Sequence, residues 1–163
     1  RRDKVIRVNV FSKGDHLEIY TSPDGEVIFK KYSPMGEMGA VSAELAEALA
    51  RTAGMSCAIC DRDAVIAAAG GAKKDILERS ISSELEQLME RRECYERGAD
   101  EQPEVLISSQ DGCAVVAAAP IITDGDVSGC VAFISEKEDT ASSEVLLGLC
   151  QSAAQFLSRR IAV

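Results

Sequence analysis

Residues 17–31 alternate apolar and polar side chains on both sides of a turn sequence, and this pattern most constrains the fold. Leu17 and Ile19 precede Ser22-Pro23-Asp24-Gly25, and Val27-Ile28-Phe29 follows it. The alternation predicts two strands, and the Pro-Asp-Gly run predicts the turn between them. A two-stranded hairpin by itself is marginal in water because it buries too little apolar surface. We therefore expect this segment to need a partner, elsewhere in the chain or in a second chain.

The rest of the chain has the pattern of a mixed helix and strand domain. Ser33-Pro34 indicates a junction, which predicts two domains, residues 1–33 and 34–163. Gly54 predicts the end of a first helix, and Asp124-Gly125 predicts a tight hairpin turn. Apolar periodicity predicts helices at 35–53, 75–80, 84–93 and 142–161 and strands at 56–60, 64–68, 105–108, 113–121 and 127–135. This order predicts an α+β fold in which helices flank an antiparallel sheet of about five strands.

Charge is divided unevenly between these two segments. Residues 1–31 hold seven Lys and Arg against five acids, whereas the remaining residues hold eleven against twenty-two. The net charge of −9 argues against nucleic-acid binding over the whole surface. The asymmetry instead indicates two modules with different partners. Aromatic residues make up only 4% and Trp is absent, which predicts an aliphatic core with few stacking platforms for single-stranded nucleic acid.

Catalytic chemistry has little support in the sequence. The single histidine, His16, stands beside Asp15 and is best interpreted as a solvated turn residue. The sequence contains no nucleophile elbow, Walker loop or dinucleotide-binding glycine motif. We therefore expect a protein that is not an enzyme, with no catalytic residues and no cofactor.

Six cysteines include one C-x-x-C pair, Cys57 and Cys60. Such a pair can bind zinc or exchange disulfides, but zinc would need two further ligands at useful spacing. Residues three apart on a strand point to opposite faces, so core packing is the favoured interpretation. Buried thiols, the lack of a visible secretory signal and the lack of a membrane-length apolar run predict a cytoplasmic protein with neither a metal site nor a membrane partner.

Two runs of small residues are candidates for ligand binding. Gly70-Gly71-Ala72-Lys73-Lys74 can hold an anion at a helix start or form a flexible turn with solvated lysines. Ala67–Ala69 and Ala117–Ala119 leave little side-chain volume on the predicted strands. They predict either a pocket beside the sheet or close packing of helices against it. Individual ligand-binding residues stay unknown.

Several stretches resemble known families. Gly14-Asp15-His16 through Lys31-Tyr32 resembles the second half of an AbrB-type swapped-hairpin DNA-binding domain, so called because hairpins of two chains interleave. The run Lys31-Tyr32-Ser33-Pro34 into a helix resembles the stage V sporulation protein T family, and so does Cys60-Asp61-Arg62-Asp63. Pro120–Ile122 and Gly125–Gly129 resemble the sheet hairpin of GAF domains. The chain departs from the AbrB pattern at its start, where Arg1-Arg2-Asp3-Lys4-Val5-Ile6-Arg7 replaces most of the first half of that domain.

The resemblance implies a cytoplasmic, sporulation-type transcription regulator that binds double-stranded DNA. It implies an AbrB-like swapped hairpin in residues 1–33 and a GAF-like domain in residues 34–163 that senses an unidentified small molecule. It also implies a homodimer or homotetramer held by swapped hairpins and by the first and last GAF helices. Arg1, Arg2, Lys4 and Arg7 are the candidate DNA contacts. The alternative is a GAF module without DNA binding, which acts through protein partners or as a redox enzyme using Cys57 or Cys60.

Overall fold

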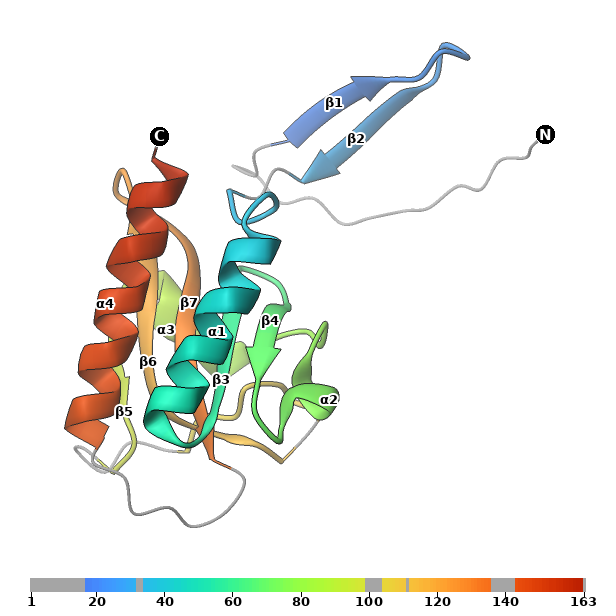
Figure 1. Ribbon diagram of the computed structural model, residues 1–163. Coiled ribbons are helices and arrows are strands. Elements are labelled where there is room, and N and C mark those ends of the chain that lie inside the picture. The colour runs from blue at the N-terminus through green and yellow to red at the C-terminus, as the bar shows by residue number, and fades with distance from the viewer. Residues whose placement is uncertain (1–16, 32–33, 99–103, 111, 136–142, 163) are drawn as a thin grey trace. The chain divides into compact units, whose positions relative to one another are not determined.

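The computed structural model describes residues 17–31, 34–98, 104–110, 112–135 and 143–162. Backbone contacts divide the chain into two compact units, residues 1–33 and 34–163. The first unit contains an antiparallel hairpin of β1 (Leu17–Thr21) and β2 (Val27–Lys31), shown in Figure 1. Its turn is closed by Ser22, whose hydroxyl accepts a hydrogen bond from the Glu26 N–H at 3.1 Å. Gly25 has a φ of 86°, a conformation that glycine adopts at no steric cost. The predicted hairpin is confirmed.

The second unit contains four helices and five strands among the residues that the structure describes. In chain order they are α1 (Gly39–Ala53), β3 (Ser56–Asp61), β4 (Val65–Ala69), α2 (Lys73–Ile76), α3 (Ser83–Arg91), β5 (Tyr95–Glu96), β6 (Ala114–Thr123), β7 (Asp126–Ser135) and α4 (Ser143–Ile161). The strands form one antiparallel sheet in the order β4-β3-β7-β6-β5. The predicted α+β fold with an antiparallel sheet of about five strands is confirmed.

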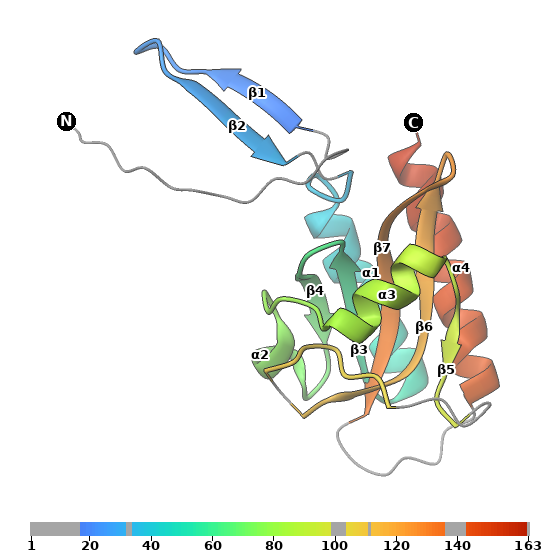
Figure 2. The same ribbon diagram turned by 180° about the vertical axis from the view of Figure 1, so that it is seen from behind.

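Each face of this sheet is covered by its own set of helices. Helices α1 and α4 lie next to each other on one face (Figure 1), and α3 crosses the opposite face (Figure 2). Phe133 and Leu157 belong to the aliphatic core under α1 and α4, whereas Ile134 and Leu85 belong to the core under α2 and α3. Alternate residues of the strands therefore serve different cores, as the period of two in a strand requires.

Local signals in the sequence place the ends of several elements. Gly54 follows α1 with a φ of 71°, and its N–H donates to the Ala50 carbonyl at 2.8 Å. Ser82 caps α3 by accepting a hydrogen bond from the Leu85 N–H at 3.1 Å. Asp124 and Gly125 have φ of 52° and 84° between β6 and β7. Positive φ at both positions defines the two-residue turn that matches strand twist.

Three parts of the element prediction were wrong. Residues 105–108 form no strand, because the backbone of Leu106 makes only an isolated bridge to Ala114 and the Ile107 carbonyl accepts from the Ser82 N–H. The fifth strand is instead β5, which is too short to show a period. The helix predicted at 75–80 is the four-residue α2. It ends early because Glu78 has a φ of 68° and its N–H donates a hydrogen bond to the Val65 carbonyl. Helix α1 also begins later than predicted, at Gly39.

Candidate functional site

One face of the β1–β2 hairpin is apolar and exposed. Ile19 is paired with Phe29 and Thr21 with Val27, so these side chains share a face with Leu17. Ile19 is 64% exposed and Phe29 is 51% exposed. Tyr20 and Ile28 are paired on the opposite face with Glu18 beside them. A hairpin that leaves its more apolar face exposed matches the expectation that it needs a partner.

The predicted DNA contacts Arg1, Arg2, Lys4 and Arg7 lie outside the described residues, and so does His16. Their placement therefore stays a prediction. They lie in the segment that leads into β1, the strand that carries Leu17 and Ile19.

The C-x-x-C pair is buried in the core. Cys57 belongs to the core under α1 and α4, and Cys60 to the core on the other face of the sheet. The predicted opposite orientation of the two side chains is confirmed. Burial raises the pKa of the Cys57 thiol to about 12. A hydrogen bond with Cys130, followed by burial, raises the pKa of Cys60. Thiols in this state are poor nucleophiles because the thiolate is the reactive form.

These environments predict how the cysteines react with a thiol reagent such as 5,5′-dithiobis(2-nitrobenzoate). In the native protein at pH 8 we expect fast modification of exposed Cys94 and slower modification of half-buried Cys113. Cys57, Cys60, Cys130 and Cys150 are buried and are expected to react only after unfolding in guanidinium, which brings the total to six. Raising the pH from 8 to 9 should leave the buried set protected, since burial also raises the pKa of Cys150. Rapid native modification of Cys57 or Cys60 would support the redox alternative.

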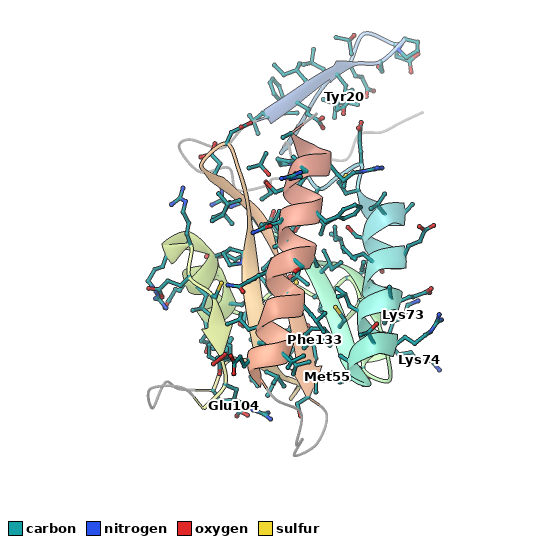
Figure 3. The ribbon with its side chains drawn as sticks, turned by 60° about the vertical axis from the view of Figure 1, so that its left-hand side comes forward. Tyr20, Met55, Lys73, Lys74, Glu104 and Phe133 are labelled. Atoms are coloured by element: carbon teal, nitrogen blue, oxygen red, sulfur yellow. The ribbon has the colours of Figure 1, made fainter. Side chains whose placement is uncertain are left out.

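An open cleft lies at the end of α1, beside the last residues of β4. It has a volume of about 430 Å³. Its lining includes the buried residues Ser56 and Ala69 together with the exposed charged residues Glu47 and Arg51. Met55, which Figure 3 labels, also lines it, together with Gly54, Gly70 and Gly71. The sequence analysis had singled out Gly54, Ala69, Gly70 and Gly71 of this lining. The other lining residues belong to the surface of α1 or to the start of β3, and they carry no motif.

The small residues of the strands serve mainly for packing. Ala67, Ala117 and Ala119 belong to the core under α1 and α4, whereas Ala68 and Ala118 belong to the core on the other face. Each of these side chains is at most 4% exposed. Close packing of helices is therefore the interpretation that the structure supports at these positions.

The anion interpretation of residues 70–74 receives no support from the geometry. The Ala72 N–H donates to the Ser56 hydroxyl at 3.0 Å, and the Lys73 N–H donates to the Gly70 carbonyl at 3.2 Å. These two donors at the start of α2 thus already have acceptors within the chain. The Lys73 and Lys74 side chains are exposed (Figure 3), as expected for a solvated turn.

The outer surfaces of α1 and α4 carry apolar side chains that the sheet does not bury. Val145 is 63% exposed and Phe156 is 45% exposed on α4. Val41 and Leu45 on α1 are only partly buried. The Arg160 guanidinium carbon lies 6.0 Å from the centre of the Phe156 ring. The two helices therefore present a mixed surface of the kind that helix packing between chains uses.

Within the described residues, no group of three or more His, Cys, Asp or Glu side chains is arranged to hold a metal ion. No helix in the same residues is long and apolar enough to cross a membrane.

The fold of the second unit is that of a GAF domain. It is similar to the GAF domain of A. aeolicus nlh2 in an inactive state (TM-score 0.55, 14% identity, 80% of this chain and 85% of that one). It is also similar to the GAF domain of an Acinetobacter phosphoenolpyruvate-protein phosphotransferase (TM-score 0.52, 15% identity, 82% and 84%). A type II free methionine-R-sulfoxide reductase from Thermoplasma acidophilum has a similar fold (TM-score 0.51, 14% identity, 78% and 92%). Identities this low establish the fold alone.

The sequence comparisons are more specific. Residues 37–162 match the family described as stage V sporulation protein T C-terminal, transcription factor. The chain is 38% identical over 149 residues to stage V sporulation protein T of Bacillus subtilis (strain 168), covering 91% of this chain and 83% of that protein. The chain belongs to the stage V sporulation protein T family of transcription factors. The predicted family is thereby confirmed, while the AbrB-type nature of the hairpin stays a prediction.

Proposed function

We propose that this chain is a cytoplasmic, DNA-binding transcription regulator of the sporulation type, whose GAF domain senses a small molecule. The observation that carries the proposal is a hairpin with an exposed apolar face, joined to a GAF-type domain in a member of this family. Family membership favours a regulator over an enzyme, and the buried, high-pKa thiols of Cys57 and Cys60 agree with that choice.

The proposed regulator is a homodimer or homotetramer. A second copy of the hairpin supplies the apolar surface that Ile19 and Phe29 need. The mixed outer surfaces of α1 and α4, with Val145 and Phe156 exposed, favour a second contact between GAF domains. Interleaved hairpins bring the basic N-terminal segments of two chains together, where their side chains can meet DNA phosphates.

Salt dependence of promoter binding tests the DNA-binding step. If Arg1, Arg2, Lys4 and Arg7 of two chains contact phosphates, about eight counterions are displaced, and the logarithm of affinity should fall with the logarithm of salt with a slope of about −7. This slope means that the affinity for DNA falls roughly 10⁴-fold between 50 and 200 mM salt. Fluorescence anisotropy with labelled promoter DNA measures the affinity.

Arg7→Ala is expected to reduce the magnitude of this slope by about 2 per dimer. Lys74→Ala removes the same charge from an exposed site on the GAF domain and should leave the slope unchanged. Absent binding, or binding that is insensitive to salt, would contradict the proposal.

Sensing is proposed to act by a population shift between two arrangements of the dimer, because a ligand moves such an equilibrium only by binding one arrangement more tightly. The cleft lined by Glu47 and Arg51 is a candidate ligand site in the described residues. Native mass spectrometry of the full chain reports subunit number and retained ligand together. A homogeneous monomer without ligand would contradict both parts of the proposal.

A further inference from the structure

The turn between β6 and β7 extends beyond the neighbouring strands. Pairing of β3 with β7 ends at Asp61 and Gly129, and β5 pairs only with Ala117 and Ala118 of β6. Residues 122–127 therefore pair with each other but with no third strand in the described residues. A register shift between Ile121 and Ile122 marks the point where this tip begins. Side chains from elsewhere must hold the tip in place, because the sheet does not.

On one side the tip is held by the end of α3. Arg92 follows α3 in the left-handed region, with a φ of 57°, and its N–H donates to the Leu88 and Met89 carbonyls. Its guanidinium donates two hydrogen bonds to the Gly125 carbonyl, from Nε at 3.1 Å and from Nη2 at 2.7 Å. Two donors on one acceptor fix both position and direction, and charge-assisted hydrogen bonds are the strong ones. Arg92 therefore links the end of α3 directly to the turn.

On the other side the tip is held by α4. The Ser158 hydroxyl donates to the Ile122 carbonyl, and the Thr123 hydroxyl donates to Ser158 at 3.4 Å. Helices α3 and α4 lie on opposite faces of the sheet (Figures 1 and 2), and their side chains belong to different cores. The four residues from Ile122 to Gly125 thus connect α3 and α4 across the sheet, beside the contact in which Gln151 of α4 donates to the Cys94 thiol at 3.6 Å.

We propose that this turn transmits displacements of α3 to α4 through Arg92 and Ser158. Both are positioning residues: Arg92 links α3 to the turn, and Ser158 links the turn to α4. The proposal deepens the proposed function, on which it rests for the role of α4 in the dimer. The turn would then be one route by which a change on one face of the sheet reaches the helix on the other face.

Hydrogen exchange followed by mass spectrometry on the full chain tests this route. Arg92→Ala should accelerate exchange of residues 122–127 roughly tenfold, because the turn loses a charge-assisted bond. It should also accelerate exchange of residues 153–161 of α4 by about threefold or more. In the reverse direction, Ser158→Ala should accelerate exchange of the turn and of residues 86–92 at the end of α3. If Arg92 and Ser158 acted only locally, their substitution would accelerate hydrogen exchange of residues 122–127 and not of the opposite helix.

Matched controls come from the same helices. Arg91→Ala removes an exposed arginine whose Nε pairs with Glu93 at 2.8 Å, and Ser152→Ala removes an exposed serine of α4. Neither should alter exchange outside its own helical turn. If Arg92→Ala does not fold, Arg92→Lys keeps the charge and is expected to give an intermediate effect.

Changes confined to residues 122–127 in the Arg92 and Ser158 variants would overturn the proposal. If hydrogen exchange accelerates in α3 and α4 as expected but the protein does not bind DNA, the result supports the route through the turn and contradicts the proposed function.

Discussion

Gly129→Ala is expected to destabilise the GAF domain by about 3 kcal/mol or more, because overpacking against backbone has no cheap relaxation. A Cβ atom at this position would lie 1.9 Å from the Cys60 carbonyl oxygen and 2.9 Å from its carbonyl carbon. Both atoms are backbone of β3, which pairs with β7 at this point. Relieving this clash would require β3 and β7 to separate. Both cores of the sheet contain residues of these two strands, so both depend on their pairing.

Urea denaturation followed by circular dichroism measures this effect. A loss of this size is a large part of the total stability of about 5–15 kcal/mol that single domains have. Gly112→Ala is the matched control, since a Cβ there has nothing within 4 Å and Gly112 has no positive φ. The control should change stability by less than about 0.5 kcal/mol. Equal midpoints for the two variants would show that β3 and β7 can move apart at little cost.

The sequence predicts elements well where the signal is local. The Asp124-Gly125 turn needs positive φ at both residues, and that requirement is visible in the residue types. The cap at Ser82 and the end of α1 at Gly54 have the same local origin. The opposite orientation of Cys57 and Cys60 follows from the period of a strand alone.

Features that depend on tertiary contacts were not predictable. Strand β5 consists of Tyr95 and Glu96, and two residues show no period; they form a strand because β6 lies beside them. The cleft combines Arg51 and Met55 with Gly70, from segments that only the folded sheet brings together. The bond from Arg92 to Gly125 spans 33 residues and has no local signal. By contrast, the expectation that the hairpin needs a partner comes from the sequence alone, since a hairpin can bury little apolar surface, and it stays a prediction.

Ile19→Asp is expected to weaken DNA binding by the full-length protein, with a loss of affinity of roughly a hundredfold or more. Ile19 lies at the centre of the apolar face, opposite Phe29. If a second hairpin covers this face, the variant buries a carboxylate without a partner, which costs several kcal/mol. The shared structure then does not form, and a lone hairpin is too unstable to present Arg7 and the other basic residues in a fixed arrangement. The melting temperature of the GAF domain should stay unchanged, because the hairpin belongs to the other compact unit.

Ile28→Asp provides a matched control, because it makes the same chemical change on the opposite face of the hairpin, where Ile28 is paired with Tyr20. Both variants add one negative charge and should repel DNA equally through that charge alone. Anisotropy measurements on the two variants therefore separate electrostatic repulsion from loss of the shared apolar core. We expect the Ile28 variant to bind DNA within about tenfold of the parent protein, because the proposed second hairpin covers the more apolar face with Ile19 and Phe29 and leaves the face of Ile28 in water. Equal losses of affinity in both variants would contradict the proposal that the second hairpin covers the face with Ile19 and Phe29 and not the opposite face.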